Sequence, residues 1–227
     1  MNDLTYAIGD IHGCAGALLR LLRRINVHRA GRPARIVCLG DYVDRGPESA
    51  QVIAILRHLQ GDAPNAITCL LGNHEQMMLD AYRDALGATV WLTNGGQETL
   101  QSFGIADPED FPHDVLTWLS LLPTVHEDAL RYYVHAGFRP GRQGIDPDVS
   151  ARLWIREPFL SAAFDFGKHV VHGHTPQTSG VPDQQAFRTN LDTGCVYGGA
   201  LTAGIFDETR PGPIGFLQVD RDDGSDR

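Results

Sequence analysis

Hydrophobic positions in the first third of the chain fall alternately into short apolar runs and into helical spacing. Three short runs have the length and composition of buried strands: residues 6–8, 35–39 and 67–71. Between the first two, residues 17–27 carry leucine and isoleucine on one face with arginines between them, which predicts an amphipathic helix. A second helix is predicted to open at Pro47 and to end at Gly61. This order of strands and helices is typical of a parallel sheet with right-handed crossovers.

The middle of the chain is predicted to be mainly helical and the last part mainly strand. Residues 74–121 have helical texture, with breaks at Gly95-Gly96, Pro108 and Pro112, and carry no obvious candidate chemistry. After residue 124, apolar runs alternate with turn residues and predict strands of a second sheet: 130–134, 168–171, 187–191, 200–206 and 214–219. Without a repeat or linker, residues 1–220 are expected to form one α/β domain, and the charged residues 221–227 a short flexible tail.

The charge and cysteine content narrow the class of protein. A net charge of -9 argues against a general nucleic-acid binder, which needs a basic surface to release counterions from phosphates. The four cysteines are scattered, without a C-x-x-C pair, so reduced core thiols are expected. Neither a signal-peptide pattern nor a long apolar segment is present, and the expected location is therefore cytoplasmic, without membrane contact.

Polar residues next to glycine follow five of the predicted strands. The segments are GDIHG at 9–13, GDYVDRG at 40–46, GNHE at 72–75, HAG at 135–137 and HGHT at 172–175. In open α/β sheets the carboxyl ends of the strands meet at one crevice, so these segments are expected to lie close together. Glycine allows the sharp turns and close backbone approaches that such a crevice needs.

Aspartate, asparagine and histidine together are ligands for divalent ions such as manganese, iron or zinc. Singly, Asp10 and Asp41 could be turn or helix-cap residues, but their joint occurrence with His12, Asn73 and His135 favours a metal site. A pair of neighbouring metals needs a shared carboxylate. Asp41 is the natural candidate because its strand should lie between those that carry Asp10 and Asn73.

Three of these segments, GDIHG, GDYVDRG and GNHE, occur in this order at intervals of roughly thirty residues. They resemble the signature of the phosphoprotein phosphatase family within the calcineurin-like metallophosphoesterases. The later segments LWIRE, HGHTP and LDTGCVYGGALT resemble its small bacterial and phage members. The resemblance spans residues 6–206 and implies a calcineurin-like catalytic domain with two packed mixed β-sheets flanked by helices.

The resemblance also implies roles for individual residues. It implies that the first metal is held by Asp10, His12 and Asp41. The second would be held by Asp41, Asn73, His135 and His174. His74 would be the general acid, oriented by Asp44, while the phosphate would be gripped by Arg45 and Arg156. Two divalent ions, two ligand carboxylates and two arginines leave the site positive, which suits a phosphate dianion in an acidic protein.

The implied activity is hydrolysis of phosphomonoesters, with phosphoserine or phosphothreonine in proteins or peptides as the expected substrate. A hydroxide bridging two ions, expected to be manganese with iron or zinc as alternatives, would attack phosphorus. A rival activity is that of a symmetrical dinucleoside tetraphosphatase, because those enzymes share the metal motifs. A catalytically inactive binding module is a third hypothesis, disfavoured because every implied ligand is present. The sequence leaves the oligomeric state open.

Two residues depart from the family pattern. Ala136 stands where glycine is more common, and Pro176 stands where many metallophosphoesterases have another histidine. The missing histidine favours the phosphatase branch and predicts a first metal that exchanges readily, so that purified protein needs added manganese.

Several neighbouring residues are given structural roles only. His172 is expected to end a strand, Glu75 to cap or brace its loop, and Trp154 to pack. The remaining histidines, His126 and His169 among them, are expected on helix faces or in loops.

Overall fold

The computed structural model describes residues 3–221, which contain two five-stranded sheets. The first sheet has the order β10-β9-β1-β2-β3 and contains β1 (Leu4–Ile8), β2 (Ala34–Cys38), β3 (Ile67–Cys69), β9 (Ala200–Phe206) and β10 (Gly215–Asp220). The second has the order β4-β5-β6-β8-β7 and contains β4 (Val125–Glu127), β5 (Arg131–Val134), β6 (His169–His172), β7 (Asp183–Gln184) and β8 (Arg188–Asn190). Both sheets are mixed, as predicted.

The first sheet confirms the predicted parallel core and corrects the assignment of two strands. β1 pairs in parallel with β2, and β2 with β3, so the strand before Asp41 does lie between those before Asp10 and Asn73. The strands near 200–206 and 214–219 were expected in the second sheet. Instead, β9 pairs antiparallel with β1, and β10 with β9. The free edge of β1 requires a partner for its backbone groups, and an apolar run alone does not reveal which sheet it joins.

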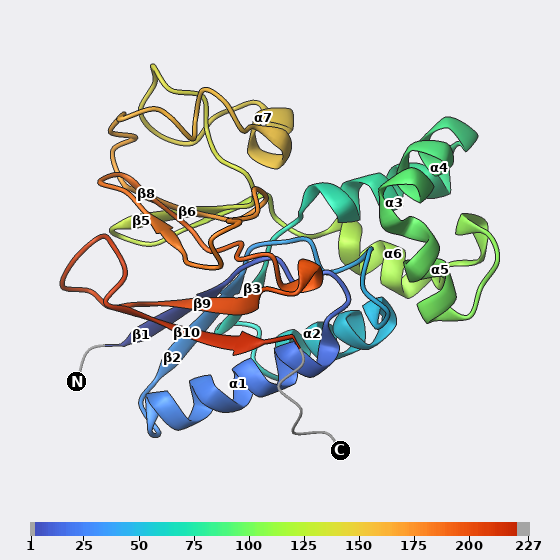
Figure 1. The fold of residues 1–227 in the computed structure, drawn as a ribbon, viewed down its shortest axis with the longest axis horizontal. Helices are drawn as coiled ribbons and strands as arrows, with labels where there is room; N and C mark the ends of the chain where they lie inside the picture. The colour runs from blue at the N-terminus through green and yellow to red at the C-terminus, as the bar shows by residue number, and fades with distance from the viewer. Residues whose placement is uncertain (1–2, 222–227) are drawn as a thin grey trace.

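The helices divide into two groups and one isolated helix (Figure 1). Below the first sheet lie α1 (Ala15–Arg29) and α2 (Ser49–Asp62). To the right of it gather α3 (Asn73–Arg83), α4 (Ala85–Trp91), α5 (Gln97–Phe103) and α6 (His113–Ser120). Above the second sheet is α7 (Val149–Trp154). The predicted break at Gly95-Gly96 is a π-helical turn, Leu92–Gly96, and short 3₁₀ turns cover Pro108–Asp110 and Cys195–Tyr197.

The core follows from the alternation of side chains along β1. Tyr6 and Ile8 pack with the apolar face of α1, while Ala7 points to the opposite side and packs between the two sheets. This second layer joins residues of both sheets: Ala7, Val37, Leu39, Leu70, Tyr133, Val171, Leu191 and Phe206. The sheets are therefore held face to face by a continuous apolar layer.

The cysteine prediction holds, since all four cysteines are buried thiols outside any disulfide. Of the predicted tail, residues 222–227 lie outside the described residues. Among residues 3–221, no helix combines the length and the apolar character needed to span a bilayer.

Candidate metal centre and acid–base pair

The predicted site residues lie on loops and helix starts at the carboxyl ends of parallel strands. Asp10 and His12 follow β1, and Asp41, Asp44 and Arg45 follow β2. Four further site residues lie in equivalent places: Asn73 and His74 open α3 behind β3, His135 follows β5, and His174 follows β6. The tenth, Arg156, instead follows the helix α7. Both sheets thus contribute to one site, as expected from the convergence of strand ends.

Three side chains of the predicted second metal group are in mutual contact. Nε2 of His135 lies 2.8 Å from Oδ1 of Asn73 and 3.2 Å from Nδ1 of His174. The distance from Asn73 Oδ1 to His174 Nδ1 is 2.9 Å, and His135 Nε2 is 3.3 Å from Oδ1 of Asp41. Asp41, His135 and His174 are buried and present ligand atoms within 4.8 Å of one another.

The predicted first metal group adjoins the second through Asp41. Its other carboxylate oxygen, Oδ2, lies 3.5 Å from Nε2 of His12. Asp10 is also buried and accepts hydrogen bonds from the backbone N–H of His174 at 3.1 and 3.0 Å. Gly173 permits this contact, because a Cβ there would lie only 2.0 Å from Asp10 Oδ1. Asp41 therefore stands between the two groups.

The histidines are oriented as metal ligands usually are. Nδ1 of His12 contacts the carbonyl of Val43 at 2.8 Å, and Nδ1 of His135 contacts the carbonyl of Leu39 at 3.0 Å. A carbonyl that accepts a proton from one ring nitrogen leaves the other nitrogen with a lone pair for a metal. Burial lowers the pKa of His12 to about 3 and also lowers that of His135, which keeps both rings in the neutral, ligating form.

The buried carboxylates also fit a cation. Burial raises the pKa of Asp10 well above its usual value, and the nearby Asp192 and Asp41 raise it further. Burial would raise the pKa of Asp41 as well, but the attraction between its carboxylate and any neighbouring imidazole that carries a proton outweighs burial and lowers that pKa. Three carboxylates in a buried site repel one another unless positive charge lies between them. The donor types and their charge thus suit a binuclear centre of divalent ions.

A histidine–carboxylate pair lies beside this centre. Nδ1 of His74 is 2.6 Å from Oδ2 of Asp44, while its Nε2 points toward Asp41, 4.0 Å from Oδ2. Burial by itself would lower the pKa of His74, but the carboxylates of Asp41 and Asp44 outweigh it and raise that pKa above its usual value. Burial raises the pKa of Asp44 as well, against the hydrogen bonds that it accepts, so both partners of the pair hold a proton more readily than they would in water.

The segment 74–121 takes part in this pair, contrary to the expectation that it carries no chemistry. Nε1 of Trp91 donates to both carboxylate oxygens of Asp44, at 3.0 and 2.9 Å, and the hydroxyl of Thr99 donates at 2.8 Å. Hydrogen bonds to a carboxylate favour its ionised form. The residue types gave no signal of this role, because a tryptophan and a threonine in a helical segment are ordinary core residues.

The two predicted phosphate-binding arginines border a cavity of about 100 Å³ above the centre, next to Asn73 and His74. Arg156 is exposed, whereas Arg45 is partly buried, with Nη1 2.8 Å from Nε2 of His12. Its guanidinium also lies over the ring of Tyr197, 5.7 Å from the centroid. Positive charge therefore faces the space where an anion would enter.

Backbone strain is concentrated at the site. Among residues 3–221, six non-glycine residues have positive φ, and five of them are predicted site residues: His12, Asp41, Asp44, Arg45 and His174. Such conformations cost about 1–3 kcal/mol each and persist where the surrounding structure enforces them. Glu75 supplies part of that enforcement, since its carboxylate accepts from the backbone N–H groups of Asp41, Tyr42, Val43 and Gly72. The bracing role predicted for Glu75 is confirmed.

Two residues at the site differ from expectation. Trp154 was predicted to pack, but it is 44% exposed and borders the cavity. Asp192 was not predicted at all, yet it is buried beside Asp10, and its Oδ1 accepts from the backbone N–H of Gly194 at 3.0 Å. The segment LDTGCVYGGALT was noted in the sequence, and its aspartate was the one available signal.

Comparisons with known proteins identify relatives that match most of this chain. Serine/threonine-protein phosphatase 1 of Salmonella typhimurium is 30% identical over 87% of this chain and 89% of its own length. The asymmetrical bis(5'-nucleosyl)-tetraphosphatase PrpE of Anoxybacillus flavithermus is also 30% identical, over 86% and 87%. A solved structure provisionally assigned as a diadenosine tetraphosphatase superposes with a TM-score of 0.69 at 25% identity, covering 96% of this chain and 97% of that one.

The family model described as calcineurin-like phosphoesterase matches residues 5–208, a span that contains every predicted site residue. Together with two mixed sheets and a histidine–aspartate centre at their strand ends, this match places the protein among the calcineurin-like phosphoesterases, a family of metal-dependent hydrolases.

Proposed function

We propose that the protein is a binuclear metal-dependent phosphomonoesterase that removes phosphate from phosphoserine and phosphothreonine in proteins. The observation that carries this proposal is the position of His74 between two carboxylates. Its Nδ1 is held by Asp44 at 2.6 Å, and its Nε2 faces Asp41 at the centre of the metal-ligand cluster. A proton donor therefore stands beside the place where a phosphate would meet two cations.

The proposed ligands fall into two groups that share Asp41. The first group is Asp10, His12 and Asp41, and the second is Asp41, Asn73, His135 and His174. Bound divalent ions would neutralise phosphate charge and lower the pKa of water to as little as about 7. Manganese is the proposed metal. The carbonyl contacts of His12 and His135 serve to hold the rings ready for ligation.

His74 is proposed as the general acid. In the reaction, the oxygen of a water molecule forms a bond to phosphorus as one of the water's protons passes to solvent, and the bond from phosphorus to the ester oxygen breaks. A serine or threonine alkoxide is a poor leaving group, so the proton on Nε2 of His74 is transferred to that oxygen as it departs. Asp44 stabilises the protonated imidazole and fixes its ring, and such acid catalysis typically contributes about 100- to 10,000-fold.

Arg45 and Arg156 are proposed to bind the phosphate oxygens. Both border the cavity, and the planar guanidinium group can donate two parallel hydrogen bonds to a phosphate. A cavity of about 100 Å³ accommodates a phosphate group but not the whole of a larger substrate. The remainder of the substrate must therefore lie on the exposed rim, where a peptide could rest.

The rival function, hydrolysis of a dinucleoside tetraphosphate, has support of its own. Trp154 and Tyr197 border the same cavity and are 44% and 62% exposed. Exposed aromatic rings beside a phosphate site can stack on nucleobases, an interaction of about 1–3 kcal/mol per base. The relatives carry both kinds of name, phosphatase and tetraphosphatase.

Turnover of a phosphoserine peptide and of diadenosine tetraphosphate by the manganese-loaded protein separates the two functions. The phosphatase proposal expects the larger kcat/KM for the peptide, and His74→Asn should impair it. A larger kcat/KM for diadenosine tetraphosphate would favour the rival function, with release of ADP indicating the symmetrical tetraphosphatase and release of ATP with AMP the asymmetrical one. Loss of that activity in Trp154→Ala would show that a base stacks on Trp154. Failure to hydrolyse either substrate or para-nitrophenyl phosphate would contradict both and leave a binding module.

A further inference from the structure

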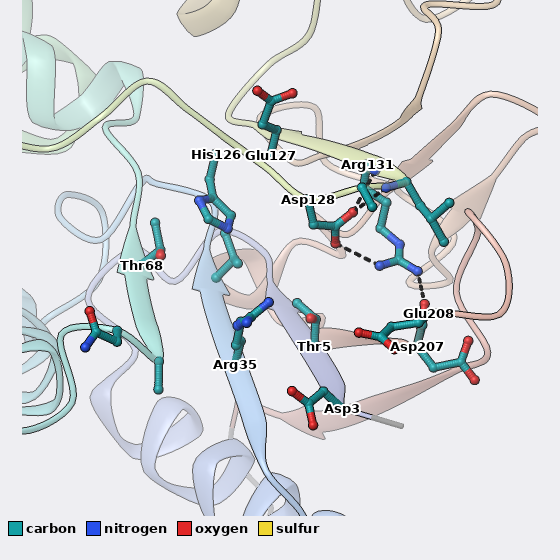
Figure 2. Close-up of a pocket in the computed structure, with 15 residues that line it drawn as sticks. Asp3, Thr5, Arg35, Thr68, His126, Glu127, Asp128, Arg131, Asp207 and Glu208 are labelled. Atoms are coloured by element: carbon teal, nitrogen blue, oxygen red, sulfur yellow. Dashed lines mark hydrogen bonds and ion pairs between the residues drawn. The ribbon is translucent and has the colours of Figure 1, made fainter. Parts of the chain in front are cut away.

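A second cavity of about 500 Å³ lies at the amino-terminal ends of β1, β2 and β3, opposite the strand ends that carry the candidate metal centre. Its floor is the face of the first sheet that turns toward the second, with Thr5, Arg35 and Thr68 on three neighbouring strands. Figure 2 shows the turn between β4 and β5 above this floor and the residues that follow β9 along one side. Such a volume is typical of sites for small molecules.

The turn that covers the cavity is rigidly built. The carboxylate of Asp128 accepts from the backbone N–H groups of Leu130 and Arg131 at 2.8 Å, and from Nη1 of Arg131 and the hydroxyl of Tyr133 at 2.8 Å. Arg131 also donates to the carbonyls of Pro211 and Arg210 and, as Figure 2 shows, to that of Asp207. Because these groups are fully engaged with one another, they hold the cavity open and are not its ligand-binding groups.

The floor, by contrast, carries polar groups that no other group uses. Within residues 3–221, the Arg35 guanidinium has neither an ion pair nor a hydrogen bond, and the hydroxyls of Thr5 and Thr68 have no hydrogen-bond partner. Thr5 and Arg35 are directly paired across β1 and β2. One guanidinium beside two hydroxyls is a set of donors that suits a carboxylate.

The rim has the opposite charge. Asp3 and Glu208 are exposed at the cavity and, like the carboxylate of Asp207, make no ion pair among the described residues, whereas Glu127 is paired with Lys168 at 2.9 Å. These three rim carboxylates outnumber the single free arginine, so a ligand with several negative charges would be repelled. A ligand that carries one carboxylate and one ammonium group satisfies both the floor and the rim.

We propose that this cavity binds a small zwitterion, either a free amino acid or a short peptide, with its carboxylate on Arg35 and its ammonium group toward Asp3 and Glu208. Val37, Ala66 and Leu130 supply the apolar part of the lining for the ligand's side chain. The site is separate from the candidate metal centre, because its floor lies at the other end of the same strands.

Calorimetric titration of the manganese-loaded protein with leucylglycine tests this proposal, with leucine titrated in parallel to separate a peptide from an amino acid. Saturable binding of one or both at one site per chain is expected. N-acetyl-leucylglycine lacks the ammonium group and leucylglycine amide lacks the carboxylate, and each should bind at least tenfold more weakly than leucylglycine. Binding should persist in saturating inorganic phosphate, since phosphate would occupy the candidate metal centre.

Arg35→Ala should weaken binding at least tenfold, and Arg35→Lys should restore part of it. Thr68→Val is a second variant: it removes one floor hydroxyl with almost no change in side-chain shape, and it should also weaken binding. Arg23→Ala is the matched control, because Arg23 is exposed on α1 away from the cavity and should leave the affinity unchanged. The proposal is overturned if neither zwitterion binds, if the blocked peptides bind as well as leucylglycine, if phosphate displaces it, or if Arg35→Ala has no effect.

Discussion

Nδ1 of His74 lies 2.6 Å from Oδ2 of Asp44, and neither side chain is more than 1% exposed. Asp44 is in turn held by Trp91 and Thr99, so the imidazole is fixed from behind by a carboxylate that has little freedom to move. Only Nε2 is left to meet a substrate. Nδ1 therefore orients the ring, and Nε2 is the nitrogen that can react. Because the proton on Nε2 would go to the leaving group, the pair should matter most when that group is a poor one.

His74→Asn is expected to lower kcat for a phosphoserine peptide about 100- to 10,000-fold, because an alkoxide cannot leave without a proton. The loss should be much smaller for para-nitrophenyl phosphate, whose phenolate leaves readily. Asp44→Asn should act in the same direction, since it removes the charge that stabilises the protonated ring. Steady-state kinetics on both substrates measure the ratio. The exposed His58 provides the control His58→Asn, and equal losses on the two substrates would refute the acid role.

Gly95 positions one of the phosphate-binding arginines. Its carbonyl accepts from the backbone N–H of Arg45 at 3.1 Å, and a Cβ at Gly95 would lie 2.7 Å from Arg45 Cγ. Gly95→Ala should therefore displace Arg45. Loss of a hydrogen bond to a charged group costs about 1.5–3 kcal/mol, so KM and the inhibition constant of phosphate should rise roughly 10- to 100-fold.

Gly104→Ala is the matched control for this substitution. Gly104 also has positive φ, at 68°, but no atom lies within 4 Å of the position that a Cβ would take. The backbone strain should lower the free energy of unfolding, by about 1 kcal/mol, without a change in KM. A normal KM in Gly95→Ala would show that Arg45 is not held by this contact.

Asp192 is expected to support the first metal. It is buried next to Asp10, and its negative charge adds to the attraction of a cation that has few protein ligands. Chelator-treated protein should be inactive and should regain activity with manganese. Asp192→Asn should weaken the lower-affinity manganese site about 10- to 100-fold, as measured by calorimetry, while leaving the other site unchanged. Asp107→Asn, which removes an exposed charge elsewhere, should bind as the wild type does; an equal affinity in Asp192→Asn would exclude this role.

The sequence predicts the parallel core and the grouping of the site residues because both depend on local signals. Apolar runs with helices between them determine β1, β2 and β3, and glycine beside Asp, Asn or His marks the loops at their ends. The order of these runs is therefore enough to predict that Asp41 lies between Asp10 and Asn73. When these loops come together in the folded chain, Gly173 lies against Asp10 and Gly95 lies against Arg45.

Contacts between distant segments were not predictable in the same way. Trp91 and Thr99 reach Asp44 from helices 47 and 55 residues later in the chain, and their residue types are common in cores. β9 has the apolar pattern of any buried strand, and only its pairing with β1 assigns it to the first sheet. Each of these depends on which surfaces meet after folding, which periodicity does not encode.

His169 was expected on a helix face or in a loop, but it begins β6 and is only 5% exposed, with Nε2 2.8 Å from the hydroxyl of Thr189. Burial lowers its pKa from 6.5 to about 4, and the positive charge of Arg131 contributes to the lowering. The folded state therefore favours the neutral ring. Above pH 6.5 the ring is neutral in both the folded and the unfolded chain, so its protonation takes nothing from the free energy of unfolding. Below pH 6.5 the unfolded chain takes up the proton first, and stability is lost as the pH falls to about 4.

A shift of this size corresponds to about 3 kcal/mol. Urea unfolding of chelator-treated protein at a series of pH values should show wild type losing up to that much more stability between pH 7 and 4 than His169→Gln, whose side chain can still bond Thr189 but does not titrate. The difference between the two proteins cancels the groups that they share, including the buried His172. His58→Gln should follow wild type, because His58 is exposed. Parallel curves for wild type and His169→Gln would mean that His169 carries its proton in the folded state despite its burial.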